Sequence, residues 1–332
     1  MKAQIIPQFG DPDVFQAAEL PDPKPGPGEV LVRVEATSVN PVDYKIRRAG
    51  PPIAPDLPAV LGCDLAGVVV GVGEGVTAFR EGDEVYGCAG GVKGMPGTYA
   101  ELIAADARLL AHKPKTLSMR KAAALPLVTI TAWEGLHDRA RLQAGQKVLV
   151  HGGAGGVGHI AIQLAKESGA VVYTTVSSVE KAETARRLGA DETINYREES
   201  VEDYVARLTN GAGFDVVFDA TGGDQITQSF AAARLNGQVI TIVSQYEADL
   251  NLMHAKGLSL HVVFMLLPML HGDGRAHHGE ILKQAAELAD AGKLRPLIEA
   301  QRFSLSEIGE AHALLEGGKA SGKVVVEVPE RA

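Results

Sequence analysis

Residues 153–158, in the middle of the chain, read Gly-Ala-Gly-Gly-Val-Gly and lie between a short apolar run and a helical pattern. The run at 147–150 is β-prone, and apolar residues at 160–165 then recur roughly at helical spacing. Glycines at a strand-to-helix turn let a pyrophosphate approach free N–H groups and the positive end of the helix dipole. This context favours a dinucleotide cradle over a plain glycine-rich turn. The predicted cradle residues are Gly153, Ala154, Gly155, Gly156, Val157 and Gly158.

Composition limits the class of protein. With 332 residues, of which 45% are hydrophobic and 22% charged, the chain can build two domains with ordinary cores. Its net charge of −9 disfavours general binding to nucleic acid or to anionic membranes. Two cysteines, Cys63 and Cys88, and an N-terminus without a signal-peptide pattern favour a cytoplasmic protein without disulfides. The best apolar run, at 261–270, is too short to cross a bilayer.

The pattern along the chain predicts an α/β protein with two parts. The first third contains short β-prone runs between Gly and Pro turns, so it reads as a mostly β domain. From about residue 125, six strands alternate with helices, which is typical of a doubly wound parallel sheet. The tail adds a helix at 280–291 and a final strand, and we expect it to fold back on the first third. The predicted domains are 1–124 with 265–332, and 125–264.

The end of the second strand of that sheet indicates which dinucleotide binds. NAD-selective folds place an acidic residue there for the ribose hydroxyls, whereas this chain has Ser177 and then Lys181 one turn later. A hydroxyl and a cation suit a 2′-phosphate, so NADP(H) is favoured. Glu180 argues against this, and a solvated helix start is the alternative for Ser177 and Lys181.

Taken together, these residues resemble the medium-chain dehydrogenase/reductase superfamily, and within it the zinc-independent, zeta-crystallin-like quinone oxidoreductase branch, over nearly the whole length. The segments that carry the resemblance are 25–47, 61–87, 97–101, 125–136, the glycine cradle, 194–199 and 321–328. The resemblance implies a GroES-like catalytic domain, split around a Rossmann nucleotide-binding domain.

The resemblance also suggests further cofactor contacts. It implies that Tyr196 joins Ser177 and Lys181 around the 2′-phosphate, although from the residues alone an aromatic that closes a strand more often serves packing. It places Thr131 beside the nicotinamide ribose and the Val243–Ser244 turn near the ring. Phe264 and Lys323 are also carried over as cofactor contacts.

Zinc-dependent relatives carry a cysteine, a histidine–glutamate pair and further cysteines as metal ligands, and this chain lacks them. Asn40 stands where the cysteine would be, Cys63 and Asp64 replace the pair, and residues 87–97 contribute only Cys88. Two cysteines remote from a histidine pair do not make a tetrahedral zinc site, so we predict no metal. Cys63 is expected to be a small buried residue rather than a nucleophile.

A site without a Lewis acid suits acceptors that are already activated, such as quinones and α,β-unsaturated carbonyls. Hydride transfer then depends on positioning and on hydrogen-bond donors near the carbonyl oxygen. Asn40 is the predicted donor, with the capping of a turn before Pro41 as its alternative. Asp43 and Lys45 follow in the same segment, and Lys45, on an expected loop, either donates to the oxyanion or only reaches solvent.

Other functions remain open at this stage. One is a catalytically silent, crystallin-like NADPH-binding protein, and another is an alcohol dehydrogenase with a non-standard metal. His271, His277 and His278 are interpreted as part of a solvated loop and helix start. An exposed apolar edge at 258–264 makes a homodimer the expected assembly, because an unpaired edge invites pairing.

Overall fold

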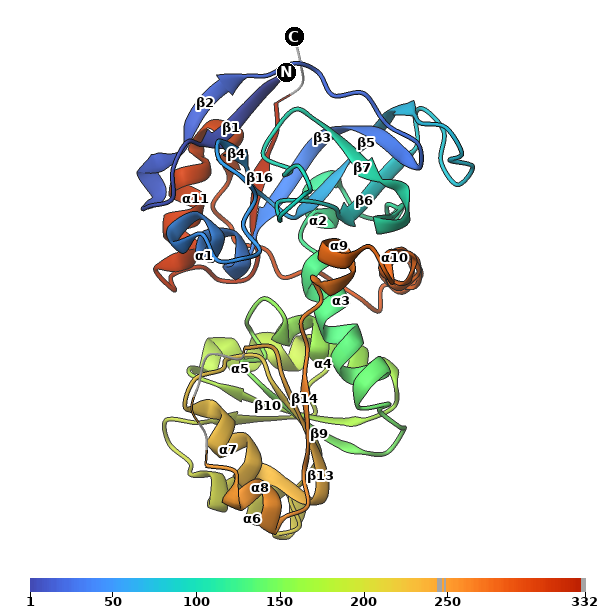
Figure 1. Ribbon diagram of the computed structural model, residues 1–332. Helices are drawn as coiled ribbons and strands as arrows, with labels where there is room; N and C mark the ends of the chain where they lie inside the picture. The colour runs from blue at the N-terminus through green and yellow to red at the C-terminus, as the bar shows by residue number, and fades with distance from the viewer. Residues whose placement is uncertain (244–246, 248, 330–332) are drawn as a thin grey trace. The chain divides into compact units, whose positions relative to one another are not determined.

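The computed structural model describes residues 1–243, 247 and 249–329. The chain packs into two compact units, which are considered separately. The first unit contains Met1–Leu127, Leu266–Gly292 and the chain from Pro296, and the second contains Val128–Met265 and Lys293–Arg295. In Figure 1 the first unit combines the blue N-terminal and red C-terminal colours, whereas the second is green to orange.

The first unit is mostly β, as the sequence predicts. Its central strand β3 (Glu29–Val39) buries every second residue along its first half, which is the burial pattern of a strand with one face on a core. A seven-stranded sheet surrounds β3, and a three-stranded sheet is formed by β1 (Lys2–Ile6), β2 (Gln16–Glu19) and β4 (Ala59–Val60). The other strands of the larger sheet are β5 (Asp64–Val72), β6 (Glu84–Cys88), β7 (Leu102–Asp106), β8 (Leu110–His112), β15 (Phe303–Ser304) and β16 (Val324–Glu327).

The C-terminal tail folds back on the first third, which confirms that expectation. Strand β16 pairs antiparallel with β3, with Val324 opposite Val39. The remaining helical segments of this unit are η1 (Pro12–Val14), α1 (Pro41–Ala49), η2 (Ala107–Leu109), α2 (Met119–Ala122), α9 (Leu267–His271), α10 (Arg275–Asp290), η4 (Leu305–Glu307) and α11 (Ile308–Glu316).

Three details of this unit differ from the sequence predictions. Helix α10 begins at Arg275, five residues before the predicted start, because its first turn is polar and shows no apolar period. His278 lies in that turn and is fully buried, so its assignment to a solvated loop is wrong. The segment after Asn40, expected to be a loop, is helix α1, with Pro41 at its first position.

The second unit is the predicted doubly wound domain. Its strands lie in the order β11-β10-β9-β12-β13-β14, and every adjacent pair is parallel within the described residues. They are β9 (Lys147–His151), β10 (Val171–Val176), β11 (Glu192–Asn195), β12 (Phe214–Asp219), β13 (Ala233–Thr241) and β14 (Ser259–Val262). The order reverses between β9 and β12, which makes this pair the topological switch point of the sheet.

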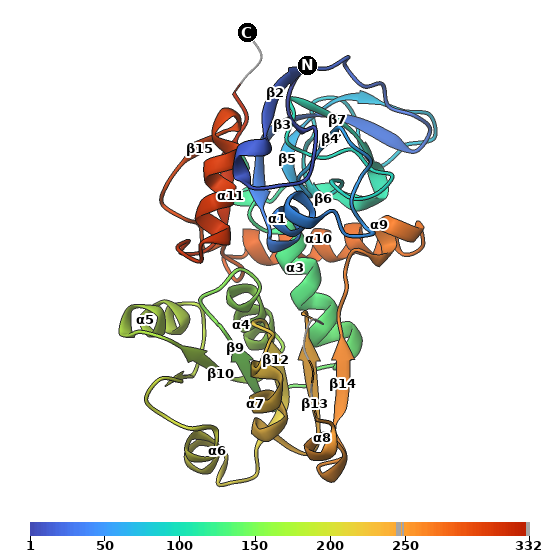
Figure 2. The same cartoon turned by 60° about the vertical axis from the view of Figure 1, so that its left-hand side comes forward.

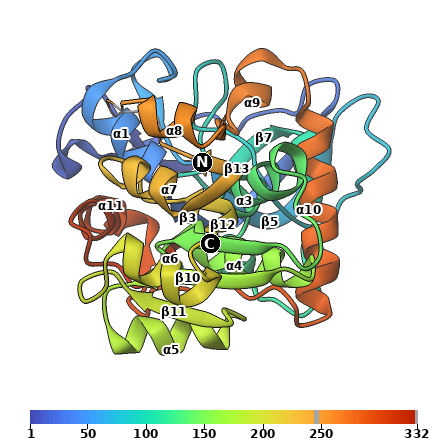
Figure 3. The ribbon, with the colours of Figure 1, turned by 90° about the horizontal axis from the view of Figure 1, so that it is seen from below.

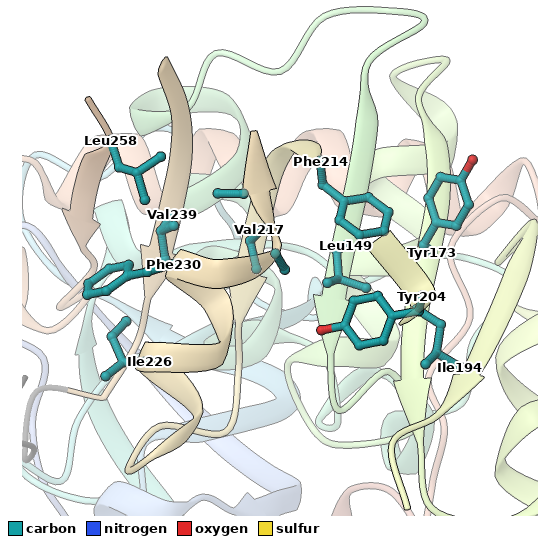
Figure 4. Close-up of a cluster of buried hydrophobic side chains, with 12 residues drawn as sticks. Leu149, Tyr173, Ile194, Tyr204, Phe214, Val217, Ile226, Phe230, Val239 and Leu258 are labelled. Carbon is teal, nitrogen blue, oxygen red and sulfur yellow. The ribbon is translucent and has the colours of Figure 1, made fainter. Parts of the chain in front are cut away.

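Helices cover both faces of this sheet. In Figure 3, α6 (Val201–Thr209) and α7 (Gln225–Ala232) lie on one side of β12, and α4 (Gly158–Glu167) lies on the other. The buried cluster in Figure 4 joins Leu149, Val217 and Val239 of the strands to Tyr204 of α6 and Phe230 of α7. The other helical segments of this part are α3 (Pro126–Trp133), the π-helix η3 (Glu134–Arg139), α5 (Val179–Arg187) and α8 (Asn251–Ala255).

Candidate functional site

The carboxyl ends of the six parallel strands bring together most of the predicted cofactor residues. Because parallel strands all end at one edge, residues that follow different strands become neighbours there, and α/β proteins bind ligands beyond that edge. Gly152 follows β9, Ser177 follows β10 and Tyr196 follows β11. Val243 and Phe264 lie within two residues of the ends of β13 and β14.

The glycine cradle lies between β9 and α4 and leaves no room for side chains at two positions. A Cβ atom at Gly153 would lie 2.0 Å from Thr174 Oγ1 and 2.6 Å from Ile162 Cδ1. At Gly158 it would lie 2.2 Å from the Gly152 carbonyl oxygen. This close packing holds the cradle directly before α4, and the His159 and Ile160 N–H groups of the first helical turn donate to the Gly155 and Val157 carbonyls of the cradle, each at 3.1 Å. The turn therefore fits the pyrophosphate of a dinucleotide.

Three residues suited to a 2′-phosphate gather beyond β10 and β11. Val176 and Asn195 are register partners, and the Tyr196 N–H donates to the Val176 carbonyl at 3.3 Å, so Ser177 and Tyr196 follow neighbouring strand ends. Lys181 is exposed in the first turn of α5, where its N–H donates to the Ser178 hydroxyl oxygen. Tyr196 is 52% exposed, so about half of its surface is accessible to a ligand.

The remaining predicted cofactor residues are more dispersed. Thr131 is buried on α3. The Val243 carbonyl accepts a hydrogen bond from Thr241 Oγ1 at 2.8 Å, which fixes the chain just beyond β13. Phe264 is 41% exposed, and Ser244 lies outside the described residues.

Lys323 lies in the first unit, in a buried polar cluster around Asn40. Its ammonium donates to Asn40 Oδ1, to the Val39 carbonyl and to Asp64 Oδ2. Asn40 Nδ2 in turn donates to Asp64 Oδ2 at 2.8 Å. These opposite partners fix the orientation of the Asn40 amide, with its oxygen toward the cation and its nitrogen toward the carboxylate.

Asp43, in the first turn of α1, completes this cluster. Its Oδ2 accepts the Asn40 N–H at 2.7 Å, and its Oδ1 accepts the Cys63 thiol at 3.2 Å. Burial raises the pKa of Asp43 to about 6, although both hydrogen bonds oppose the rise. Two causes raise the pKa of the Cys63 thiol well above its usual value. The larger is a hydrogen bond with Cys88, and the second is burial. Cys63 is thus the buried residue that the sequence predicts.

The structure brings Asn40 and Asp43 together but separates Lys45 from them. Lys45 is exposed on α1 instead of lying on a loop. Asn40 directly precedes α1 as its N-cap residue, where the alternative expected a turn, and its side-chain amide contacts Lys323 and Asp64. Sequence reasoning missed Asp64 as a member of the cluster, because its role depends on contacts 24 and 259 residues away.

Asp64 is the most connected carboxylate of this cluster. Besides Asn40 and Lys323, it accepts the Ser38 hydroxyl at 2.7 Å and the Leu127 N–H at 2.8 Å. Within residues 1–243, 247 and 249–329, no three His, Cys, Asp or Glu side chains are grouped as a metal site needs. Two of the positions that the resemblance compares with zinc ligands, Asn40 and Asp64, both contact the Lys323 ammonium.

Comparisons with known proteins agree with this geometry. Two family models match: the alcohol dehydrogenase GroES-like domain over residues 26–115 and the zinc-binding dehydrogenase over 188–326. The chain is 38% identical to a 2-methylene-furan-3-one reductase from Solanum lycopersicum, over 98% of this chain and 79% of that protein. It is 36% identical, with the same coverage, to an NADPH-dependent alkenal/one oxidoreductase, chloroplastic, from Arabidopsis thaliana.

Solved structures are also similar. An alcohol dehydrogenase superfamily protein from Novosphingobium aromaticivorans has a TM-score of 0.94 and 44% identity, covering 99% of this chain and all of that one. The Escherichia coli quinone oxidoreductase complexed with NADPH has a TM-score of 0.87 and 28% identity, covering 98% of this chain and all of that one.

A GroES-like fold joined to a Rossmann sheet with a glycine cradle defines a nucleotide-dependent dehydrogenase or reductase. The chain belongs to the medium-chain dehydrogenase/reductase superfamily, in its zeta-crystallin-like quinone oxidoreductase branch. None of the helices in the described part of the chain is long and apolar enough to span a membrane.

Proposed function

We propose that this protein is an NADPH-dependent oxidoreductase that transfers hydride to a quinone or an α,β-unsaturated carbonyl without a metal. The observation that carries the proposal is the carboxyl edge of the parallel sheet, where the glycine cradle adjoins Ser177, Lys181 and Tyr196. The names of the Arabidopsis and Escherichia coli proteins, which refer to NADPH and to alkenal/one or quinone chemistry, support the same assignment.

The cofactor, when bound, supplies the hydride. Residues 153–158 would hold its pyrophosphate, through N–H groups other than that of Gly155, which donates to the Gly152 carbonyl at 2.8 Å. Ser177, Lys181 and Tyr196 would hold its 2′-phosphate. Thr131, the Val243–Ser244 segment and Phe264 are the proposed contacts to its other half. Lys323 is also carried over as a proposed cofactor contact, but its three hydrogen bonds favour a role in holding Asn40.

Asn40 is the proposed donor to the substrate. Negative charge builds on the carbonyl oxygen during hydride transfer, and a fixed donor stabilises it because no reorganisation is needed. Asp64 takes one Nδ2 hydrogen of Asn40, and we assign the other to that oxygen. Asp43 would hold the Asn40 backbone, and Lys45 would add positive charge from the exposed face of α1.

The assay that tests this function measures NADPH oxidation with a panel of quinones and 2-alkenals, beside direct NADPH titration. Turnover with members of either class supports the proposal. Tight NADPH binding without turnover on any acceptor would favour a catalytically silent, crystallin-like protein. Activity that is lost to chelators, with stoichiometric zinc in the purified protein, would favour an alcohol dehydrogenase.

Three further assignments accompany this function. The catalytic domain is proposed as residues 1–124 and 265–332, and the NADP-binding domain as 125–264. Free, buried Cys63 and Cys88 support a cytoplasmic location, which a fluorescent fusion would test. A homodimer is proposed through β14, which ends the strand order and carries Val262 at 48% exposure (Figure 2).

A further inference from the structure

The turn after β12 is built around one oxygen of a buried carboxylate. Asp219 ends the strand with none of its surface exposed. Its Oδ1 accepts three hydrogen bonds: from the Thr221 N–H at 2.9 Å, the Thr221 hydroxyl at 2.8 Å and the Gly222 N–H at 2.9 Å. Hydrogen bonds to a carboxylate are stronger than those between neutral groups, so they hold this turn in one conformation.

This turn packs between two segments that the proposed function assigns to the cofactor: the start of the glycine cradle and the chain that follows β13. A Cβ atom at Gly152, which opens the glycine cradle, would lie 2.9 Å from Thr221 Cγ2. A Cβ atom at Gly222 would lie 2.5 Å from Val243 Cβ. The position of Thr221 and Gly222 is therefore coupled to the start of the cradle and to the chain beyond β13.

The neighbouring histidine does not neutralise this carboxylate. His151 is the register partner of Asp219 on β9, at the switch point of the sheet. Burial lowers the pKa of His151 to about 4, despite the opposing charge of Asp219. The second carboxylate oxygen, Oδ2, has no hydrogen-bond partner among the described residues. The three donors of the turn are thus the groups that hold Asp219.

The strand order indicates which half of the cofactor this turn faces. The proposed function places the 2′-phosphate beyond β10 and β11, and the pyrophosphate beyond β9. Because β12 and β13 come next in the strand order, a dinucleotide that lies along the carboxyl edge of the sheet continues beyond these two strands. That remaining half carries the nicotinamide. We propose that Asp219 is a positioning residue for the nicotinamide half of NADPH, acting through the Thr221–Gly222 turn. This inference rests on the proposed function.

Binding of two ligands tests the proposal. NADPH spans the whole edge, whereas 2′,5′-ADP carries only the adenosine half, with its 2′-phosphate and a single 5′-phosphate. For Asp219→Ala we expect NADPH to bind roughly tenfold more weakly, because the turn loses all three bonds, while 2′,5′-ADP binds as in the wild type. Asp219→Asn keeps an acceptor oxygen and should rescue most of the NADPH affinity. Equal weakening of both ligands, or no change in either, would overturn the proposal.

Two controls separate the possible failures. Thr221→Val removes the hydroxyl hydrogen bond to Asp219 but keeps the methyl group that packs against Gly152. It is the variant to measure if Asp219→Ala does not fold. We expect it to weaken NADPH alone, by roughly threefold, and an equal effect on 2′,5′-ADP would again count against the proposal. Ser177→Asp should instead weaken both ligands. Wild-type protein that binds neither ligand would refute the proposed function itself.

Discussion

The ammonium of Lys323 and the carboxylate of Asp64 form an ion pair of 3.4 Å in which both side chains are almost completely buried. Breaking a buried pair leaves an uncompensated charge, which costs about 3 to 5 kcal/mol of unfolding free energy. We therefore expect Lys323→Met to be strongly destabilising in urea unfolding. The matched change Lys45→Met, on the exposed face of α1, should stay within about 0.5 kcal/mol of the wild type. Equal changes in the free energy of unfolding for the two variants would show that the buried ion pair does not contribute to stability.

Removing the Asp43 carboxyl should change how stability depends on pH. The folded pKa of about 6 lies above the ordinary value of 3.8, so this group stabilises the fold at low pH, and its contribution is lost as pH rises through about 6. The free energy of unfolding of the wild type should fall by roughly 3 kcal/mol relative to Asp43→Asn between about pH 4 and pH 7. Urea unfolding at several pH values measures this difference, and parallel curves would contradict it.

Ser177→Asp should weaken NADPH by roughly 1 to 3 kcal/mol, because a hydrogen bond is lost and a negative charge faces the 2′-phosphate. NADH, which lacks that phosphate, is the control ligand and should bind no more weakly than to the wild type. Fluorescence titration of both cofactors gives the comparison. Unchanged NADPH affinity would remove the assignment of the 2′-phosphate to the ends of β10 and β11.

Gly153→Ala should destabilise the protein by about 1 to 3 kcal/mol, because its Cβ would overlap Thr174 and Ile162. Gly71→Ala is the control, since a Cβ there would meet its nearest neighbour, Leu31 Cβ, at 3.4 Å. Chemical unfolding of both variants, beside NADPH titration, checks whether close packing of the cradle supports stability and binding. If Gly71→Ala lowered the free energy of unfolding as much as Gly153→Ala, close packing of the cradle would not be the cause.

Val262→Lys should dissociate the proposed homodimer, because it places a charge on the exposed edge of β14. Val70→Lys, on β5 of the other unit, makes the same change at a comparably exposed strand position. Sedimentation velocity over a range of concentrations would compare the two variants with the wild type. A wild-type protein that sediments as a monomer would exclude the dimer at once.

The sequence predicts the second unit almost completely, because alternating strands and helices follow periods that can be counted. It also locates Ser177, Lys181 and Tyr196, since each follows a strand that the pattern identifies. It fails for α1, where Asn40 and Pro41 read as a turn, and for His278, whose burial depends on distant neighbours. Asp64 and Asp219 were missed for the same reason: their partners are set by the folded backbone, which the local pattern does not contain.

The parallel sheet keeps its ligand edge separate from its core. Ser177, Lys181 and Tyr196 lie beyond the strand ends, and none of them belongs to the buried cluster of Leu149, Tyr204 and Phe230. The proposed 2′-phosphate contacts are therefore open to redesign: a mutant library confined to these three codons should change the preference between pyridine nucleotides while the scaffold keeps its melting temperature.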